Sequence, residues 1–433
     1  MRLLALLFIA LTAQGADRLT LEEAQKRALA GNHALKLARL KAGESAERRA
    51  AARADFFPKV LMDANYFYFT KPLGTTLNLG GMGILPPPLP SIPVPLDVVR
   101  QNFFFGGVGV GQPLTQMFKI RAGVDAAASE EGAAKAVIEK AKHEVAYAVE
   151  QLYYGLLISE RQRVAAQLKV AAAEELLRDA QNAVEAGKAL PVASLGRRAQ
   201  VLESKQTLLA VEMQSADYAE AFNNLMGSPA SVRWELVEPE RPQQSIQSPE
   251  EAIQMAVKLS PEVREAEQTR SRASAGVRAA QADYIPDVTA FFTYYHQTGI
   301  SAMPHDFGAA GARLSYTLFD FGKRRAQVKE RQFLLEQAEE NLRRVRDQLE
   351  VDVRKNFRAV ERSTGMLNVA REAAALRKES ERLSKDQFEL GLANQASYMD
   401  AQAARASAEA DLLRAEVGWR LAWAELRKTV GTQ

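Results

Sequence analysis

The sequence has no cysteine among its 433 residues. Disulfide bonds therefore cannot stabilise this fold, and an exported chain of this length must be held together by burial or by assembly with other chains. We also expect no lipid anchor attached to an N-terminal cysteine.

Long apolar runs are equally scarce. The first residues place Arg2 before a short apolar run, Leu3 to Leu11, and end in small residues, which predicts a signal peptide over 1–15 with cleavage after Gly15. Nothing later offers the roughly 20 uncharged apolar residues that a membrane helix needs. If the chain crosses a membrane, we expect it to do so with strands.

The sequence also has little excess of charge of one sign and few aromatic residues. The 56 basic and 53 acidic residues leave a net charge of +3, so no basic field is present and we expect no nucleic-acid partner. Aromatic residues make up 7%, and long tracts consist of Ala, Glu, Gln, Arg, Lys and Leu. This composition predicts long helices packed side by side.

Two copies of one unit are present. The segment that starts at Thr20 matches the segment that starts at Ser248, and Gly187 and Gly227 match Gly391 and Gly431. The first copy carries about 24 extra residues in a Pro/Gly-rich tract, 72–96, and a length change at one place indicates a surface loop. We predict a first repeat over 16–227, a linker or equatorial segment over 228–247 and a second repeat over 248–433.

Each repeat is predicted to contain a β-hairpin, over 59–115 and 287–318. Val60, Met62, Ala64, Tyr66 and Tyr68 alternate with residues of the opposite face, which is typical of a strand. About ten residues is the length of a tilted membrane-spanning strand. Four such strands cannot close a barrel, so the missing strands must come from other chains.

Long helices are predicted to follow each hairpin. No proline interrupts Lys323 to Leu390, and apolar residues recur at steps of three or four. A helix of ~68 residues would reach roughly 100 Å and must pack along a partner, as in a coiled coil. The partners are the return segment 395–428 and the equivalent segments of the first copy, 119–186 and 191–226.

The order of these elements, and their occurrence in two copies, resemble the TolC-like outer-membrane factor family. The resemblance rests on LSYTLFDFGKRRAQV from Leu314, FELGLANQASYMDAQ from Phe388 and the closing glycines Gly227 and Gly431. It implies an α+β membrane protein in the outer membrane, a trimeric twelve-stranded β-barrel that continues into a periplasmic α-helical barrel. One departure is Phe118, which stands where the second copy has a glycine at the junction between strand and helix, so the two junctions need not bend alike.

The resemblance also implies a function and its partners. The chain would be the channel subunit of a tripartite efflux or type I secretion system, a passive duct for small molecules or polypeptides. It would work as a homotrimer with a periplasmic adaptor (membrane fusion) protein and an inner-membrane pump, in contact with outer-membrane lipid. The alternative is a periplasmic coiled-coil scaffold without a pore, which would not need the alternating hairpins.

The turns between the long helices are the candidate sites. A glycine at each turn lets the chain reverse, which is a structural role by itself. By resemblance, the same turns are the tips that contact the adaptor. The candidate residues are Gly187, Lys188, Ala189 and Leu190 in the first tip and Gly391, Leu392, Ala393 and Asn394 in the second.

Other candidate sites are weaker. Asp400 matches one of two acidic positions that narrow the lumen in some relatives, while Ser397 stands at the other, so Asp400 is either a lumen constriction or a solvated aspartate. The four histidines are scattered without metal-ligand spacing, so no metal, cofactor or enzyme activity is expected. The aromatic clusters 66–69 and 103–105 are interpreted as an interfacial girdle, with core packing as the alternative.

Overall fold

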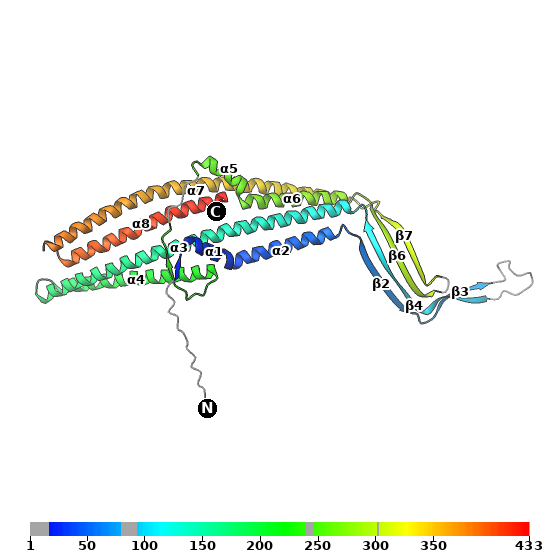
Figure 1. The fold of residues 1–433 in the computed structure, drawn as a ribbon, viewed down its shortest axis with the longest axis horizontal. Helices are drawn as coiled ribbons and strands as arrows, with labels where there is room; N and C mark the ends of the chain where they lie inside the picture. The colour runs from blue at the N-terminus through cyan, green and yellow to red at the C-terminus, as the bar shows by residue number, and fades with distance from the viewer. Residues whose placement is uncertain (1–16, 79–92, 240–245, 301–302, 433) are drawn as a thin grey trace, which may run out of the picture. The chain divides into compact units, whose positions relative to one another are not determined.

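The computed structural model describes residues 17–78, 93–239, 246–300 and 303–432 (Figure 1). The predicted signal peptide and part of the predicted linker lie outside them. In both halves of the chain, two short helices precede strands and then two long helices. The elements in chain order are β1 (Asp17–Leu19), α1 (Leu21–Gly31), α2 (His33–Ala54), β2 (Lys59–Tyr68), β3 (Leu73–Asn78), β4 (Pro93–Pro113), α3 (Met117–Glu185), α4 (Pro191–Met226), β5 (Trp234–Leu236), α5 (Pro249–Leu259), α6 (Pro261–Ala282), β6 (Asp287–Ile300), β7 (Asp306–Ser315), α7 (Lys323–Glu389) and α8 (Gln395–Val430).

The chain divides into two compact units. The helical unit comprises the described residues up to 42, 134–266 and 342 onward, and the sheet unit comprises those of 43–133 and 267–341. Helices α2, α3, α6 and α7 contribute residues to both. Within the described ranges, none of the helices carries an apolar stretch sufficient to span a lipid bilayer.

The short helices α1 and α5 begin directly after the capping residues Thr20 and Ser248. The hydroxyl of Thr20 accepts a hydrogen bond from the backbone N–H of Glu23 at 3.3 Å, and Ser248 accepts one from Glu251 at 3.2 Å. Each bond satisfies an N–H that the first helical turn leaves unpaired. The two copies therefore start with the same local chemistry.

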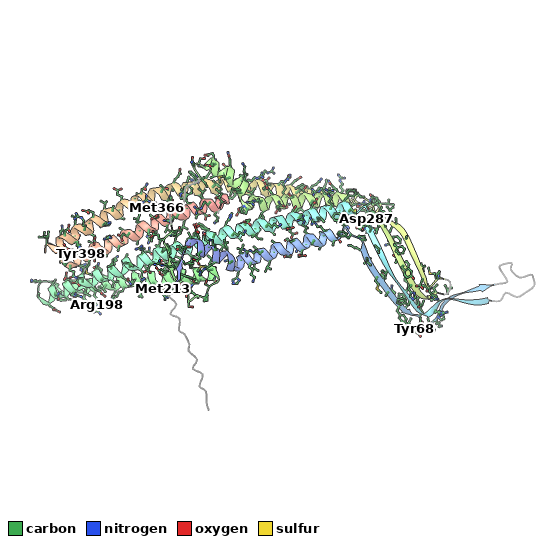
Figure 2. All side chains as sticks on the ribbon, in the orientation of Figure 1. Tyr68, Arg198, Met213, Asp287, Met366 and Tyr398 are labelled. Atoms are coloured by element: carbon green, nitrogen blue, oxygen red, sulfur yellow. The ribbon has the colours of Figure 1, made fainter. Side chains whose placement is uncertain are left out.

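The sheet unit contains an antiparallel sheet in the order β2-β4-β6-β7, and β3 pairs with the far end of β4. Figure 2 shows Tyr68 and Asp287 at opposite ends of this sheet. We call the end near Asp287, where the helices attach, the helical end and the other the far end. The predicted alternation along β2 is confirmed, because Val60, Met62 and Tyr66 share one face and Asp63 lies on the other.

The Pro/Gly-rich tract 72–96 is not a loop throughout its described part. Leu73 pairs with Val99 and Asn78 with Pro93, so the β2–β4 hairpin is extended by β3. Residues 79–92, the centre of the tract, lie outside the described residues.

The two junctions between strand and helix differ in backbone conformation. Phe118 lies within α3, so the helix of the first copy continues through this position. In the second copy, Phe321 and Gly322 precede α7 with φ values of 53° and 85°. A positive φ is strained for a residue with a side chain, so the second junction bends in a way that the first does not.

The helical unit is built on two helical hairpins, α3 with α4 and α7 with α8 (Figure 1). Buried residues of α8 recur every seven positions at Ala396, Ala403, Ala410, Val417 and Ala424. A seven-residue repeat keeps one face of a helix against its partner, as in a coiled coil, and alanine permits close approach. The prediction that the long helices pack along each other is confirmed.

A hydrophobic core surrounds the parallel pair β1 and β5. Tyr153 of α3 is fully buried, and its hydroxyl lies 2.8 Å from the carbonyl oxygen of Leu19 and 2.5 Å from that of Val237, so its single proton is donated to one of the two at a time. Burial raises the pKa of Tyr153 to about 12. This hydrogen bond ties the start of the described chain to the segment between the repeats.

Candidate functional site: the two helical tips

The two tips have the same backbone geometry. Gly187 and Gly391 have φ values of 68° and 72°, in the left-handed region that favours glycine. In the first tip, the N–H of Lys188 donates to the carbonyl of Ala183 at 2.8 Å; in the second, Leu392 donates to Gln387 at 2.9 Å. These bonds close the ends of α3 and α7 in the Schellman pattern.

Both tips present apolar side chains to solvent. Leu190 is 74% exposed and Leu392 is 77% exposed. Lys188 is exposed beside Leu190, while Ala189 and Ala393 are half-buried. An exposed leucine at a fixed turn supplies the kind of apolar contact that a protein partner uses.

The return helices begin differently. Leu190 provides no side-chain cap, and Pro191 occupies the first turn of α4. In the second tip, the Asn394 side chain accepts a hydrogen bond from the Ser397 N–H at 3.0 Å and donates another to Asp179 at 3.3 Å. Asp179 belongs to α3, so this bond links the two hairpins.

Asp179 is not identifiable as a site residue from the sequence. No local pattern distinguishes it from other charged residues of α3, and only the packing of α3 near the start of α8 brings it to Asn394. The stacking of Phe388 on Tyr398, with ring centroids 5.7 Å apart, was also missed. Their spacing across the predicted turn was the one available indication of this contact.

Ion pairs connect the two helices of each hairpin behind its tip. Lys205 of α4 lies 2.8 Å from Glu174 of α3, and Arg405 of α8 lies 3.2 Å from Glu381 of α7. Surface pairs of this kind contribute about 0 to 1 kcal/mol each. Packing of the helices therefore contributes most of the stability.

Asp400 lies on α8, one helical turn after Ser397, and is exposed. A solvated aspartate and an aspartate that narrows a lumen would both be exposed, so exposure does not distinguish the two roles. The assignment of Asp400 to a constriction therefore stays a prediction.

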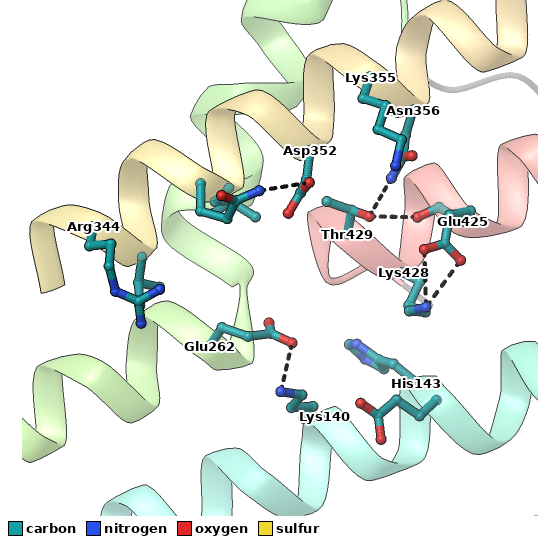
Figure 3. A pocket seen from close by; sticks show the side chains of 14 residues that line it. Lys140, His143, Glu262, Arg344, Asp352, Lys355, Asn356, Glu425, Lys428 and Thr429 are labelled. Carbon is teal, nitrogen blue, oxygen red and sulfur yellow. Dashed lines mark hydrogen bonds and ion pairs between the residues drawn. The ribbon is translucent and has the colours of Figure 1, made fainter. Parts of the chain in front are cut away.

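A polar cleft of about 380 Å³ lies between α3, α6, α7 and α8 (Figure 3). Lys140 and Glu262 form an ion pair of 3.7 Å across it, and His143 lies beside them. The Nδ1 atom of His143 is buried without a hydrogen-bond partner. Burial lowers the pKa of His143.

No group of three or more potential metal ligands occurs among the described residues. His296 pairs with Asp306 across two strands, and His305 contacts the backbone carbonyl of Gln297. Both histidines therefore have contacts within the sheet unit.

The sheet presents two unlike faces. We define the apolar face by its large exposed side chains, which include Val60, Met62, Tyr66, Phe292 and Leu314. The opposite face, which we call the polar face, is defined by the other register positions. Its polar members include Lys59, Asp63, Asn65, Thr289, Thr293 and Arg313.

Solved structures with this architecture include outer-membrane channels. The chain is similar to a membrane protein from Pseudomonas aeruginosa, with a TM-score of 0.76 and 17% identity over 95% of this chain and 93% of that one. It is also similar to the CmeC outer membrane channel of Campylobacter jejuni, with a TM-score of 0.76 and 14% identity over 95% and 85%. The outer membrane protein VceC of Vibrio cholerae has a TM-score of 0.73 and 16% identity over 95% and 96%.

At these identities, the likeness establishes the fold. No curated protein matches the sequence. The family model for outer membrane efflux proteins matches residues 24–228 and 252–432, so the chain belongs to the outer membrane efflux protein family.

Membership gives the general function and location. Proteins of this family are outer-membrane efflux channels of tripartite pumps, with a periplasmic extension, and they are transport proteins. They form homotrimers and work with adaptor and pump partners.

Proposed function

We propose that three copies of this chain close a twelve-stranded barrel in the outer membrane. The observation that carries the proposal is the apolar face, where Met62 is 77% exposed and Leu314 is 68% exposed. Such a face is suited to lipid. The edges of the described sheet at β2 and β7 support the same proposal, because unpaired strand edges are not tolerated in a bilayer and neighbouring copies would pair them.

The assembled channel acts as a passive export duct. An inner-membrane pump supplies the energy and a periplasmic adaptor protein contacts the tips, so the channel itself needs no cofactor. The exposed leucines of both tips support the adaptor contact. The near balance of basic and acidic residues supports the absence of a nucleic-acid partner.

The tract 72–96 faces the cell exterior in this proposal. Helices attach to the helical end of the sheet, and β3 extends the far end. A protease added to intact cells should therefore cleave within 72–96. Cleavage only after the outer membrane is breached would contradict this orientation.

Fractionation and mass measurement test the assembly. The mature protein should be recovered in the outer membrane, and its mass in detergent should be that of a trimer. A soluble periplasmic protein would support the coiled-coil scaffold, and a monomer in detergent would contradict the shared barrel.

A further inference from the structure

Six aromatic rings form a continuous row across the sheet. Successive ring centroids are 5.2 to 6.2 Å apart, and successive ring planes differ by only 17° to 30°. Rings in this parallel-displaced arrangement stack favourably. The row consists of Phe69, Phe67, Phe103, Phe105, Tyr295 and Phe307.

The row lies on the polar face. Phe67 is paired with Phe103, and Phe105 is paired with Asn65, so these rings share a face with Asn65. Tyr66 and its partner lie on the apolar face instead. The aromatic clusters that the sequence suggested as one girdle are therefore divided between the two faces.

An acidic side chain stands in the same row of the sheet. Asp63 is paired with Gly107, and Gly107 is paired with Tyr295 on its other side. A Cβ atom at Gly107 would lie 2.9 Å from the Tyr295 ring, so this ring leans over the glycine. The carboxylate and the ring thus flank one glycine position.

The basic residues of the polar face contact other side chains closer to the helical end of the sheet. Lys59 lies 2.9 Å from Asp55, and the Arg313 guanidinium lies 5.9 Å from the centre of the Phe291 ring. Asp63 therefore gives the surroundings of Tyr295 a negative charge.

We infer that the aromatic row lines the pore and binds planar aromatic cations as they leave. This inference rests on the proposed channel. A flat cation stacks on the rings, is attracted to their π-faces and is held by the Asp63 carboxylate. The chemistry fits a planar organic cation better than a hydrated metal ion or a polypeptide, because stacking requires a flat, weakly hydrated surface.

Channel block in planar lipid bilayers tests this inference. Trimers are reconstituted, and ethidium, a planar aromatic cation, is added while single-channel conductance is recorded. Replacing both Phe105→Leu and Tyr295→Leu should raise the half-blocking concentration about tenfold or more, because each stacking contact contributes about 1–3 kcal/mol. Asp63→Asn should raise it several-fold.

Matched variants separate this effect from general damage to the barrel. Phe104→Leu with Tyr294→Leu alters the same two strands on the apolar face and should leave ethidium block unchanged. Tyr295→Phe keeps the ring and should also leave it unchanged. Tetraethylammonium, a cation without a ring, cannot stack, so Phe105→Leu with Tyr295→Leu should weaken its block less than ethidium block.

The outcomes are distinct. Unchanged ethidium block in the Phe105/Tyr295 double variant overturns the inference while the channel stands. An equal effect of the apolar-face variant also overturns it, because the aromatic row would then have no special role. A wild-type trimer without conductance overturns the proposed channel and the inference together.

Discussion

The side-chain amide of Asn394 donates a hydrogen bond to Asp179 at 3.3 Å, which joins two residues 215 positions apart. Asn394 starts α8 and Asp179 lies near the end of α3, so one polar contact links the two tips. Because both residues are exposed, the bond contributes little to overall stability. Its effect is to hold the two tips in position relative to each other.

Loss of this link should change how the tips open. Asn394→Ser keeps an oxygen that caps α8 but removes the amide that reaches Asp179. We expect Asn394→Ser and Asp179→Ala each to raise single-channel conductance, with no further increase in the double variant. Additive increases would show that the two residues act separately.

Valine at both tip glycines should abolish export while trimer abundance stays nearly normal. Nothing lies within 4 Å of a Cβ atom at Gly187 or Gly391, so the cost is the positive φ alone, about 1 kcal/mol or more per site. Export activity and trimer abundance are measured in the same cells. Gly196→Val and Gly365→Val add the same bulk to open helical positions and serve as controls. Normal export by the tip variant would show that the two glycines only form turns.

Charge at the exposed leucines should weaken adaptor binding. Leu190→Glu with Leu392→Glu should lower the affinity at least about tenfold, because a charged group replaces an apolar contact at a protein interface. Binding of purified adaptor to the trimer measures this change. Leu190→Met with Leu392→Met preserves the apolar surface and should bind normally. If the glutamate variant bound equally well, the adaptor contact would lie elsewhere.

Acidification should destabilise the helical unit through His143. Burial lowers the pKa of this side chain in the folded protein, so the unfolded chain binds its proton more readily. Stability is therefore present above the ordinary pKa of 6.5 and is lost as the pH falls toward the lowered value. The neighbouring charges act in both directions: Glu139 and Glu262 raise the pKa, while Arg264 and Lys142 lower it.

The melting temperature measured by circular dichroism at about pH 7 and about pH 5 tests this effect. His143→Gln cannot be protonated and should show a smaller decrease than the wild type. His33→Gln removes an exposed histidine and should melt like the wild type at both values. A decrease in His143→Gln equal to that of the wild type would assign the pH dependence to other groups.

The sequence by itself determined the elements that depend on local chemistry. Capping residues such as Thr20 and Ser248 start helices because they satisfy nearby N–H groups, and glycines such as Gly391 end them because they tolerate a positive φ. Alternation along β2 separated Asp63 from Val60 because neighbouring strand residues point to opposite faces.

Only the tertiary structure decided which distant residues meet. The Asn394–Asp179 bond, the polar cleft around His143 and the row from Phe69 to Phe307 each depend on helix packing or strand register. A register shift of one residue would move every ring of a strand to the other face, and no local pattern fixes the register between distant strands. Long-range packing therefore decided the contacts, because it joins segments whose local sequences carry no information about each other.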